Sequence, residues 1–155
     1  MGFVFAGEDE SGYVPVEDPL VRANIEEWRD AKFGLMMHWG PYSQWGVVES
    51  WSICSEDWIK RPEDNYEDYK RKYKKLPSTF NPVRFDPDKW AKAADLAGMR
   101  YVVFTTKHHD GFCMFDTQTT DYKITGPVVP FASHPLADVT RAVFDSFRKR
   151  GMKTG

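Results

Sequence analysis

Two short apolar runs that end in histidine are the features that most restrict the fold of this chain. Residues 33–37 are apolar without polar alternation and are followed by His38. Residues 101–106 are rich in β-branched and aromatic side chains and are followed by Lys107, His108 and His109. Runs of this kind are typical of strands in a parallel sheet that helices cover. We therefore predict two parallel strands with histidines at their carboxyl ends.

Helical patterns separate these two predicted strands. Residues 86–98 have Asp86 at the N-cap, Pro87 at the first helical position and Gly98 as a stop signal. Amphipathic patterns predict three further helices, over 20–30, 66–75 and 136–150. A third strand is expected to begin after the last of these helices, at about residue 152. Residues 42–65 show no lasting periodicity and predict a long loop, the kind of segment that often carries function.

The order of the predicted elements defines the fold class. Strands that alternate with helices are typical of consecutive parallel βα units, an α/β architecture. A length of 155 residues is too short for a complete eight-stranded barrel. A chain that ends where a strand begins also leaves a sheet edge open. We therefore expect a fragment of a larger domain.

Composition narrows the classes of partner. The net charge is -2, from 21 basic and 23 acidic residues, which gives no electrostatic footprint for nucleic acid. No apolar run is long enough to insert into a membrane, and the first ten residues lack the pattern of a signal peptide, so localisation stays open. Cys54 and Cys113 form neither a CxxC pair nor a disulfide framework.

The histidines at the two strand ends admit three interpretations. Functional groups gather at the carboxyl ends of parallel strands, so His38, His108 and His109 should share one rim. They are structural hydrogen-bonding residues, or they bind Zn²⁺ or Mn²⁺ together with Asp110, or they bind sugar hydroxyls. The metal interpretation is disfavoured because neighbouring residues of a strand point to opposite sides and no HExxH spacing is present.

The sugar interpretation draws on the tryptophans and acids of the first long loop. Aromatic residues make up 15% of the chain, including six tryptophans. An aromatic ring suits the flat, apolar face of a sugar, and carboxylates accept hydrogen bonds from its hydroxyls. The candidates for the ring are Trp39, Trp51 and Trp58, and those for the carboxylates are Glu49, Glu56 and Asp57.

Residues 33–43 and 105–112 together resemble the paired signature of the α-L-fucosidases, glycoside hydrolase family 29. Residues 85–101 and 151–153 are similar to the same family at the expected places. The resemblance extends over residues 30–155.

This resemblance implies a (β/α)₈ TIM barrel and a retaining mechanism without metal or organic cofactor. The chain would then be an incomplete barrel, with its first two βα units and the start of the third strand. Residues 1–29 would be an N-terminal extension and helix, and residues 30–155 the N-terminal part of the catalytic domain. The nucleophile and the acid/base are expected downstream of Gly155, so no catalytic residue is assigned and the fragment alone is expected to be inactive.

The resemblance also implies which residues contact the substrate, a fucosylated oligosaccharide or glycoconjugate. His38, His108 and His109 match family residues that bind the sugar. The family has a Glu-Trp pair in the first loop, and two segments here, 49–51 and 56–58, each insert one residue between acid and tryptophan. Trp58 is favoured by its distance from the helix at Tyr66. The predicted substrate-binding set is His38, His108, His109, Trp58, Glu56 and Trp51, with no metal.

Two other functions remain open on the sequence. One is a sugar-binding module that kept the fucose pocket without catalysis, and the other is a metal-dependent barrel hydrolase.

Overall fold

The computed structural model describes residues 14, 16–56, 61 and 65–155. Trp58 and Asp57 of the first long loop therefore lie outside the described residues. The chain divides into two units, Met1–Lys32 and Phe33–Gly155. The sequence-based domain boundary at residues 29 and 30 stays a prediction.

The described residues of the first unit form the helix α1, Pro19–Ala31, close to the predicted 20–30. Asp18 is its N-cap, because its carboxylate accepts hydrogen bonds from the backbone N–H of Leu20 at 2.8 Å and of Val21 at 3.2 Å. No residue of α1 is buried, and Val21 and Trp28 of its apolar face are exposed.

The second unit contains a parallel sheet of three strands in the order β1-β2-β3. The strands are β1, Gly34–Met37, β2, Tyr101–Phe104, and β3, Lys153–Thr154. Gly34 is in register with Tyr101, and Met37 with Phe104. The three predicted strands and their parallel order are confirmed.

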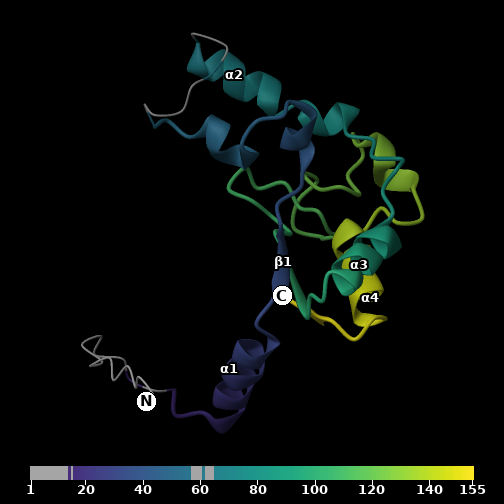
Figure 1. Ribbon diagram of the computed structural model, residues 1–155. Coiled ribbons are helices and arrows are strands. Elements are labelled where there is room, and N and C mark those ends of the chain that lie inside the picture. The colour runs from purple at the N-terminus through teal and green to yellow at the C-terminus, as the bar shows by residue number, and fades with distance from the viewer. Residues whose placement is uncertain (1–13, 15, 57–60, 62–64) are drawn as a thin grey trace, which may run out of the picture. The chain divides into compact units, whose positions relative to one another are not determined.

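In the described part of this unit, three α-helices and four short 3₁₀ segments connect the strands. The helices are α2, Tyr66–Tyr73, α3, Pro87–Leu96, and α4, Val139–Arg148. The 3₁₀ segments are η1, Pro41–Gln44, η2, Glu49–Ile53, η3, Leu76–Thr79, and η4, Pro130–Ser133. Helices α3 and α4 lie side by side (Figure 1), each between two consecutive strands in the chain.

The main core lies between the sheet and helices α3 and α4. Val102 and Phe104 of β2 are buried in one cluster with Ala91 and Ala94 of α3 and with Phe147 of α4. The small side chains of Ala91 and Ala94 allow α3 to approach the sheet closely. A second cluster packs Tyr69 and Tyr73 of α2 against other buried residues of the loop region. This second cluster supports the loop that follows β1.

Two predicted boundaries are wrong, and each has a local cause. The second strand was predicted to reach residue 106 but ends at Phe104, because the backbone N–H of Met114 donates to Thr106 O at 2.8 Å and pairs this segment elsewhere. The last helix was predicted from residue 136 but begins at Val139. Asp138 is its N-cap, since its carboxylate accepts from Arg141 N at 3.1 Å.

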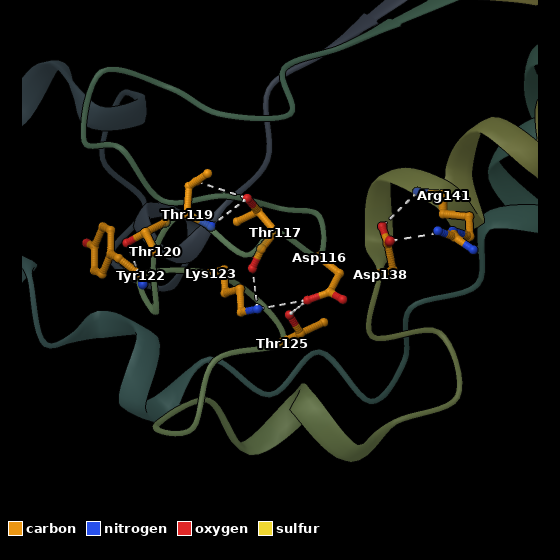
Figure 2. A network of polar contacts seen from close by, with 9 residues as sticks. All are labelled: Asp116, Thr117, Thr119, Thr120, Tyr122, Lys123, Thr125, Asp138 and Arg141. Carbon is orange, nitrogen blue, oxygen red and sulfur yellow. Dashed lines mark hydrogen bonds and ion pairs between the residues drawn. The ribbon is translucent and has the colours of Figure 1, made fainter.

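The loop after β2 is held by polar contacts around Asp116 (Figure 2). Its carboxylate pairs with Lys123 Nζ at 2.9 Å and accepts a hydrogen bond from Thr125 Oγ1 at 2.7 Å. These contacts lower the pKa of Asp116, with the Lys123 hydrogen bond as the largest cause. They give the long segment between β2 and α4 a defined path.

No helix among the described residues is long and apolar enough to cross a membrane.

We predict that Gly34→Ala destabilises the sheet. A Cβ atom at this position would overlap the ring of Tyr101 on the neighbouring strand. Such overpacking costs about 1–3 kcal/mol, measured as the free energy of unfolding in urea. In a Tyr101→Ala background the same substitution should cost much less, and an equal cost in both backgrounds would contradict the packing argument.

Candidate functional site

The carboxylate of Glu49 lies between the two histidines that follow β1 and β2. Its Oε1 is 3.5 Å from His38 Nδ1, and its Oε2 is 3.1 Å from His108 Nε2. The rings of His38 and His108 have centroids 5.5 Å apart. Parallel pairing of β1 and β2 places their carboxyl ends at one edge, and the segment η2 brings Glu49 to that edge.

His108 is the most enclosed member of this group, with a side chain only 8% exposed. The hydroxyl of Ser50 is hydrogen-bonded to its Nδ1. Burial is the largest cause that lowers the pKa of His108 from its ordinary value of 6.5, while the Glu49 carboxylate acts in the opposite direction. The imidazole is therefore neutral at neutral pH. The tautomer that satisfies both neighbours donates Nε2–H to Glu49 and accepts the Ser50 O–H at Nδ1.

Trp51 covers the outer side of the histidines. Its Nε1–H donates to Glu49 Oε2 at 3.1 Å. Its ring centroid lies 5.0 Å from that of His109 and 5.9 Å from that of His108, and the residue is 37% exposed. A half-exposed aromatic face beside hydrogen-bonding groups is the arrangement that sugar binding requires.

The backbone at Glu49 adopts a conformation that is uncommon for a residue with a side chain. Its φ is +49°, in the left-handed region. Such a conformation costs about 1–3 kcal/mol and persists where the surrounding contacts compensate for it, often at functional sites. Here the carboxylate contacts with His38, His108 and Trp51 supply that compensation.

Asp110 fixes the turn that follows His108 and His109. Its Oδ2 accepts the Tyr73 O–H at 2.7 Å, and its Oδ1 accepts the Phe112 N–H at 3.0 Å. Gly111, at a φ of +83°, closes the turn. Both oxygens of Asp110 therefore have partners within the turn and α2. This argues against the predicted metal set that used Asp110 as its carboxylate.

The structure brings together four of the six residues predicted to bind the substrate. His38, His108, His109 and Trp51 lie together, whereas Glu56 is exposed and Trp58 lies outside the described residues. Of the two acid–tryptophan segments, 49–51 is described in full, and its Glu49 and Trp51 contact the histidines. The preference for Trp58 therefore stays a prediction.

Trp39 does not face this rim. Its ring packs against Phe80, Phe85 and Trp90, with centroids 5.2–5.6 Å apart. It therefore packs against the core cluster, and the hypothesis that it covers a sugar stays a prediction. It lies two positions after Met37, which packs against that same core, so both side chains point to the helix-covered side.

Three contributors were not in the predicted set. Glu49 was considered only as one of several loop acids, and Ser50 carried no signal because its buried hydroxyl acquires a partner only in the fold. Tyr42 lies four residues beyond His38, with a ring centroid 6.2 Å from that of His108. Its buried hydroxyl has no hydrogen-bond partner among the described residues. Burial, then Glu49 and Asp110, raise the pKa of Tyr42, so it stays a hydrogen-bond donor.

Among the described residues, one group of side chains has the spacing to hold a metal ion. It consists of His38, Glu49 and His108, with one ligand atom from each and all three atoms within 4.8 Å of one another.

Residues 4–155 match the family model described as Alpha-L-fucosidase. The chain belongs to the alpha-L-fucosidase family. The tissue alpha-L-fucosidase of Rattus norvegicus is 36% identical over 107 residues, which are 64% of this chain and 23% of that protein. A putative alpha-L-fucosidase of Caenorhabditis elegans is 29% identical over 151 residues, 92% of this chain and 30% of the relative. The chain thus spans 23% and 30% of the length of these two relatives.

Solved structures of fucosidases share the fold. Alpha-L-fucosidase isoenzyme 1 from Paenibacillus thiaminolyticus matches with a TM-score of 0.63 and 42% identity over 83% of this chain and 27% of its own. The fucosidase AlfC from Lactobacillus casei, in complex with its α-L-fucose product, matches with a TM-score of 0.63 and 30% identity, over 85% of this chain and 39% of its own. The three parallel strands therefore correspond to part of a fucosidase catalytic domain.

We predict that Glu49→Gln lowers the pKa of His108 further, because it removes the negative charge that opposes the effect of burial. The pKa of His108 in the unchanged chain should already lie below 6.5, so its contribution to stability is present above that pH and is lost as the pH falls. Titration of the histidine ring signals by NMR measures both values. An unchanged or raised pKa in the variant would contradict the proximity of the two groups.

Proposed function

We propose that this chain supplies the fucose-binding rim of a retaining α-L-fucosidase, which releases terminal α-linked L-fucose from an oligosaccharide or glycoconjugate. Membership of the family supports the reaction class. The location of the fucose-binding site is supported by one observation: His38 and His108 both contact Glu49, beside the exposed ring of Trp51.

The chemistry of these side chains suits a sugar ring. The Glu49 carboxylate accepts hydrogen bonds from hydroxyl groups, and the His38 imidazole can donate or accept them, while His108, with both ring nitrogens engaged by Ser50 and Glu49, orients the carboxylate. The Trp51 ring offers an apolar surface to the carbon-bound hydrogens. His109 lies against the same ring and extends the polar rim. Such hydrogen bonds shorten as the sugar flattens toward an oxocarbenium ion, so they lower the activation barrier as well as binding the substrate.

We also propose that strands β1, β2 and β3 are the first three strands of a (β/α)₈ barrel. The parallel order and the helices α3 and α4 between strands support this architecture. In a barrel, His38 and His108 would face the cavity at the carboxyl ends of the strands. Residues 1–29 would then precede the catalytic domain.

A retaining glycosidase needs two carboxyl groups about 5–5.5 Å apart, a nucleophile and an acid/base. In our proposal neither comes from this chain, because Glu49 is held by His38, His108 and Trp51, and Asp110 by Tyr73 and Phe112. The proposed role of the chain is substrate recognition, and the chain alone should bind fucose without cleaving a fucoside.

We predict that the chain binds L-fucose and does not bind its mirror image, D-fucose. Saturation-transfer NMR with each sugar, at equal concentration, measures this difference. His38→Ala should abolish the L-fucose signal. His134→Asn is the matched control, because the Asn oxygen can replace the His134 Nδ1 that accepts from Leu136 N at 3.1 Å, away from the rim. Equal signals for both sugars would contradict the proposal.

We further predict that His38→Ala lowers turnover of an aryl α-L-fucoside at least about 100-fold in a longer protein that contains this chain and the two carboxyl groups. Loss of a transition-state hydrogen bond to the sugar costs about 2.7 kcal/mol at that factor. The side chain of His38 is 28% exposed, so the thermal unfolding midpoint should change little. Turnover that equals that of the unchanged protein would exclude the role. Fucose binding without turnover in the longer protein would favour a sugar-binding module.

A further inference from the structure

One ligand atom each from His38, Glu49 and His108 lies within 4.8 Å of the other two, close enough for the three side chains to converge on one metal ion. Zinc binds nitrogen and oxygen at about 2.0–2.2 Å, and a tetrahedral arrangement then separates neighbouring donors by about 3.3–3.6 Å. The observed separations are 3.5 Å between His38 Nδ1 and Glu49 Oε1, and 3.1 Å between His108 Nε2 and Glu49 Oε2. The two distances involve different carboxylate oxygens of Glu49, so binding of one ion requires the side chains to rotate until they form a shared set of ligands.

The surroundings would hold the ligands in the required state. A zinc-bound imidazole normally donates its other ring N–H to a neighbour, which fixes its tautomer. Ser50 is that neighbour for His108. With an ion on Nε2, the ring proton is on Nδ1, and the Ser50 hydroxyl oxygen accepts a hydrogen bond from this Nδ1–H. Trp51 Nε1–H supports the Glu49 carboxylate in the same way, from 3.1 Å.

We propose that His38, Glu49 and His108 form a binding site for one Zn²⁺ ion, and that the bound ion excludes the sugar. Two neutral imidazoles and one carboxylate suit zinc better than Mg²⁺ or Ca²⁺, which prefer oxygen ligands. The side chains of His38 and Glu49 are 28% and 25% exposed, so the ion can enter from solvent and complete its coordination with water.

The exclusion of sugar rests on the function proposed above. The ion occupies the lone pairs that would otherwise receive hydrogen bonds from hydroxyls. Zinc therefore acts as an inhibitor that competes with fucose and takes no part in catalysis. The site differs from the predicted metal set because Glu49, whose carboxylate faces both His38 and His108, replaces Asp110, whose oxygens accept from Tyr73 and Phe112.

Titration of the chain with ZnCl₂ in a calorimeter at pH 7.5 tests the metal site without any sugar. We expect one ion per chain. His38→Ala and Glu49→Gln should each weaken zinc binding at least about tenfold, and Ser50→Ala should weaken it about tenfold through His108. His134→Asn should bind zinc like the unchanged chain. Circular dichroism verifies that each variant folds. If His38→Ala does not fold, Glu49→Gln still tests the site, because glutamine has nearly the same shape as glutamate.

Cobalt identifies the ligands by a second readout. Co²⁺ bound to nitrogen and oxygen shows visible bands of tetrahedral or five-coordinate geometry without the ultraviolet thiolate band that Cys54 or Cys113 would produce. A thiolate band, or zinc affinity that neither His38→Ala nor Glu49→Gln reduces, would overturn the site. Failure to bind zinc at millimolar concentration would overturn it too.

Competition separates this inference from the proposed function. We expect zinc to suppress the L-fucose signal in saturation-transfer NMR, and His109→Ala to weaken fucose binding while zinc still binds. L-fucose binding that depends on His38, without zinc binding, would overturn the zinc site and leave the proposed function standing. Simultaneous binding of both ligands would overturn the exclusion.

Discussion

The carboxylate of Glu49 joins three parts of the chain that are far apart in sequence. It contacts His38 after β1, His108 after β2 and Trp51 in its own 3₁₀ segment. The other features of the rim depend on this junction. It compensates for the left-handed backbone at Glu49, holds the neutral imidazole of His108 between two partners and keeps the Trp51 ring beside His109.

Packing beneath the rim explains why this junction can form. Parallel pairing of β1 and β2 brings the segments that contain His38 and His108 to the same edge of the sheet. On one side the Trp39 ring is fixed among aromatic residues of the core. On the other, Tyr73 of α2 holds Asp110 and thereby the turn after His109. The segments that hold the polar groups of the rim thus pack against two separate hydrophobic clusters. This packing, more than the loop backbone, orients those groups.

Local sequence signals predicted the elements that local forces determine. Asp86, Pro87 and Gly98 mark the ends of a helix through contacts within a few residues, and the structure has α3 there. These local signals gave wrong or incomplete predictions where contacts with residues distant in sequence determine the structure. The pairing of Thr106 with Met114 shortens β2, and Trp39 joins the core because residues 41 or more positions away surround it. Glu49 could not be separated from other loop acids, since only the fold brings both histidines to it.

The central claim is that a fucose ring is recognised at the Glu49 junction. A crystal structure of the chain with bound L-fucose tests it most directly. Our account predicts sugar hydroxyls within hydrogen-bond distance of His38, Glu49 or His108, with the carbon-bound hydrogens of the ring against Trp51. A sugar bound at another surface, with the three side chains in contact only with one another and with water, would contradict it.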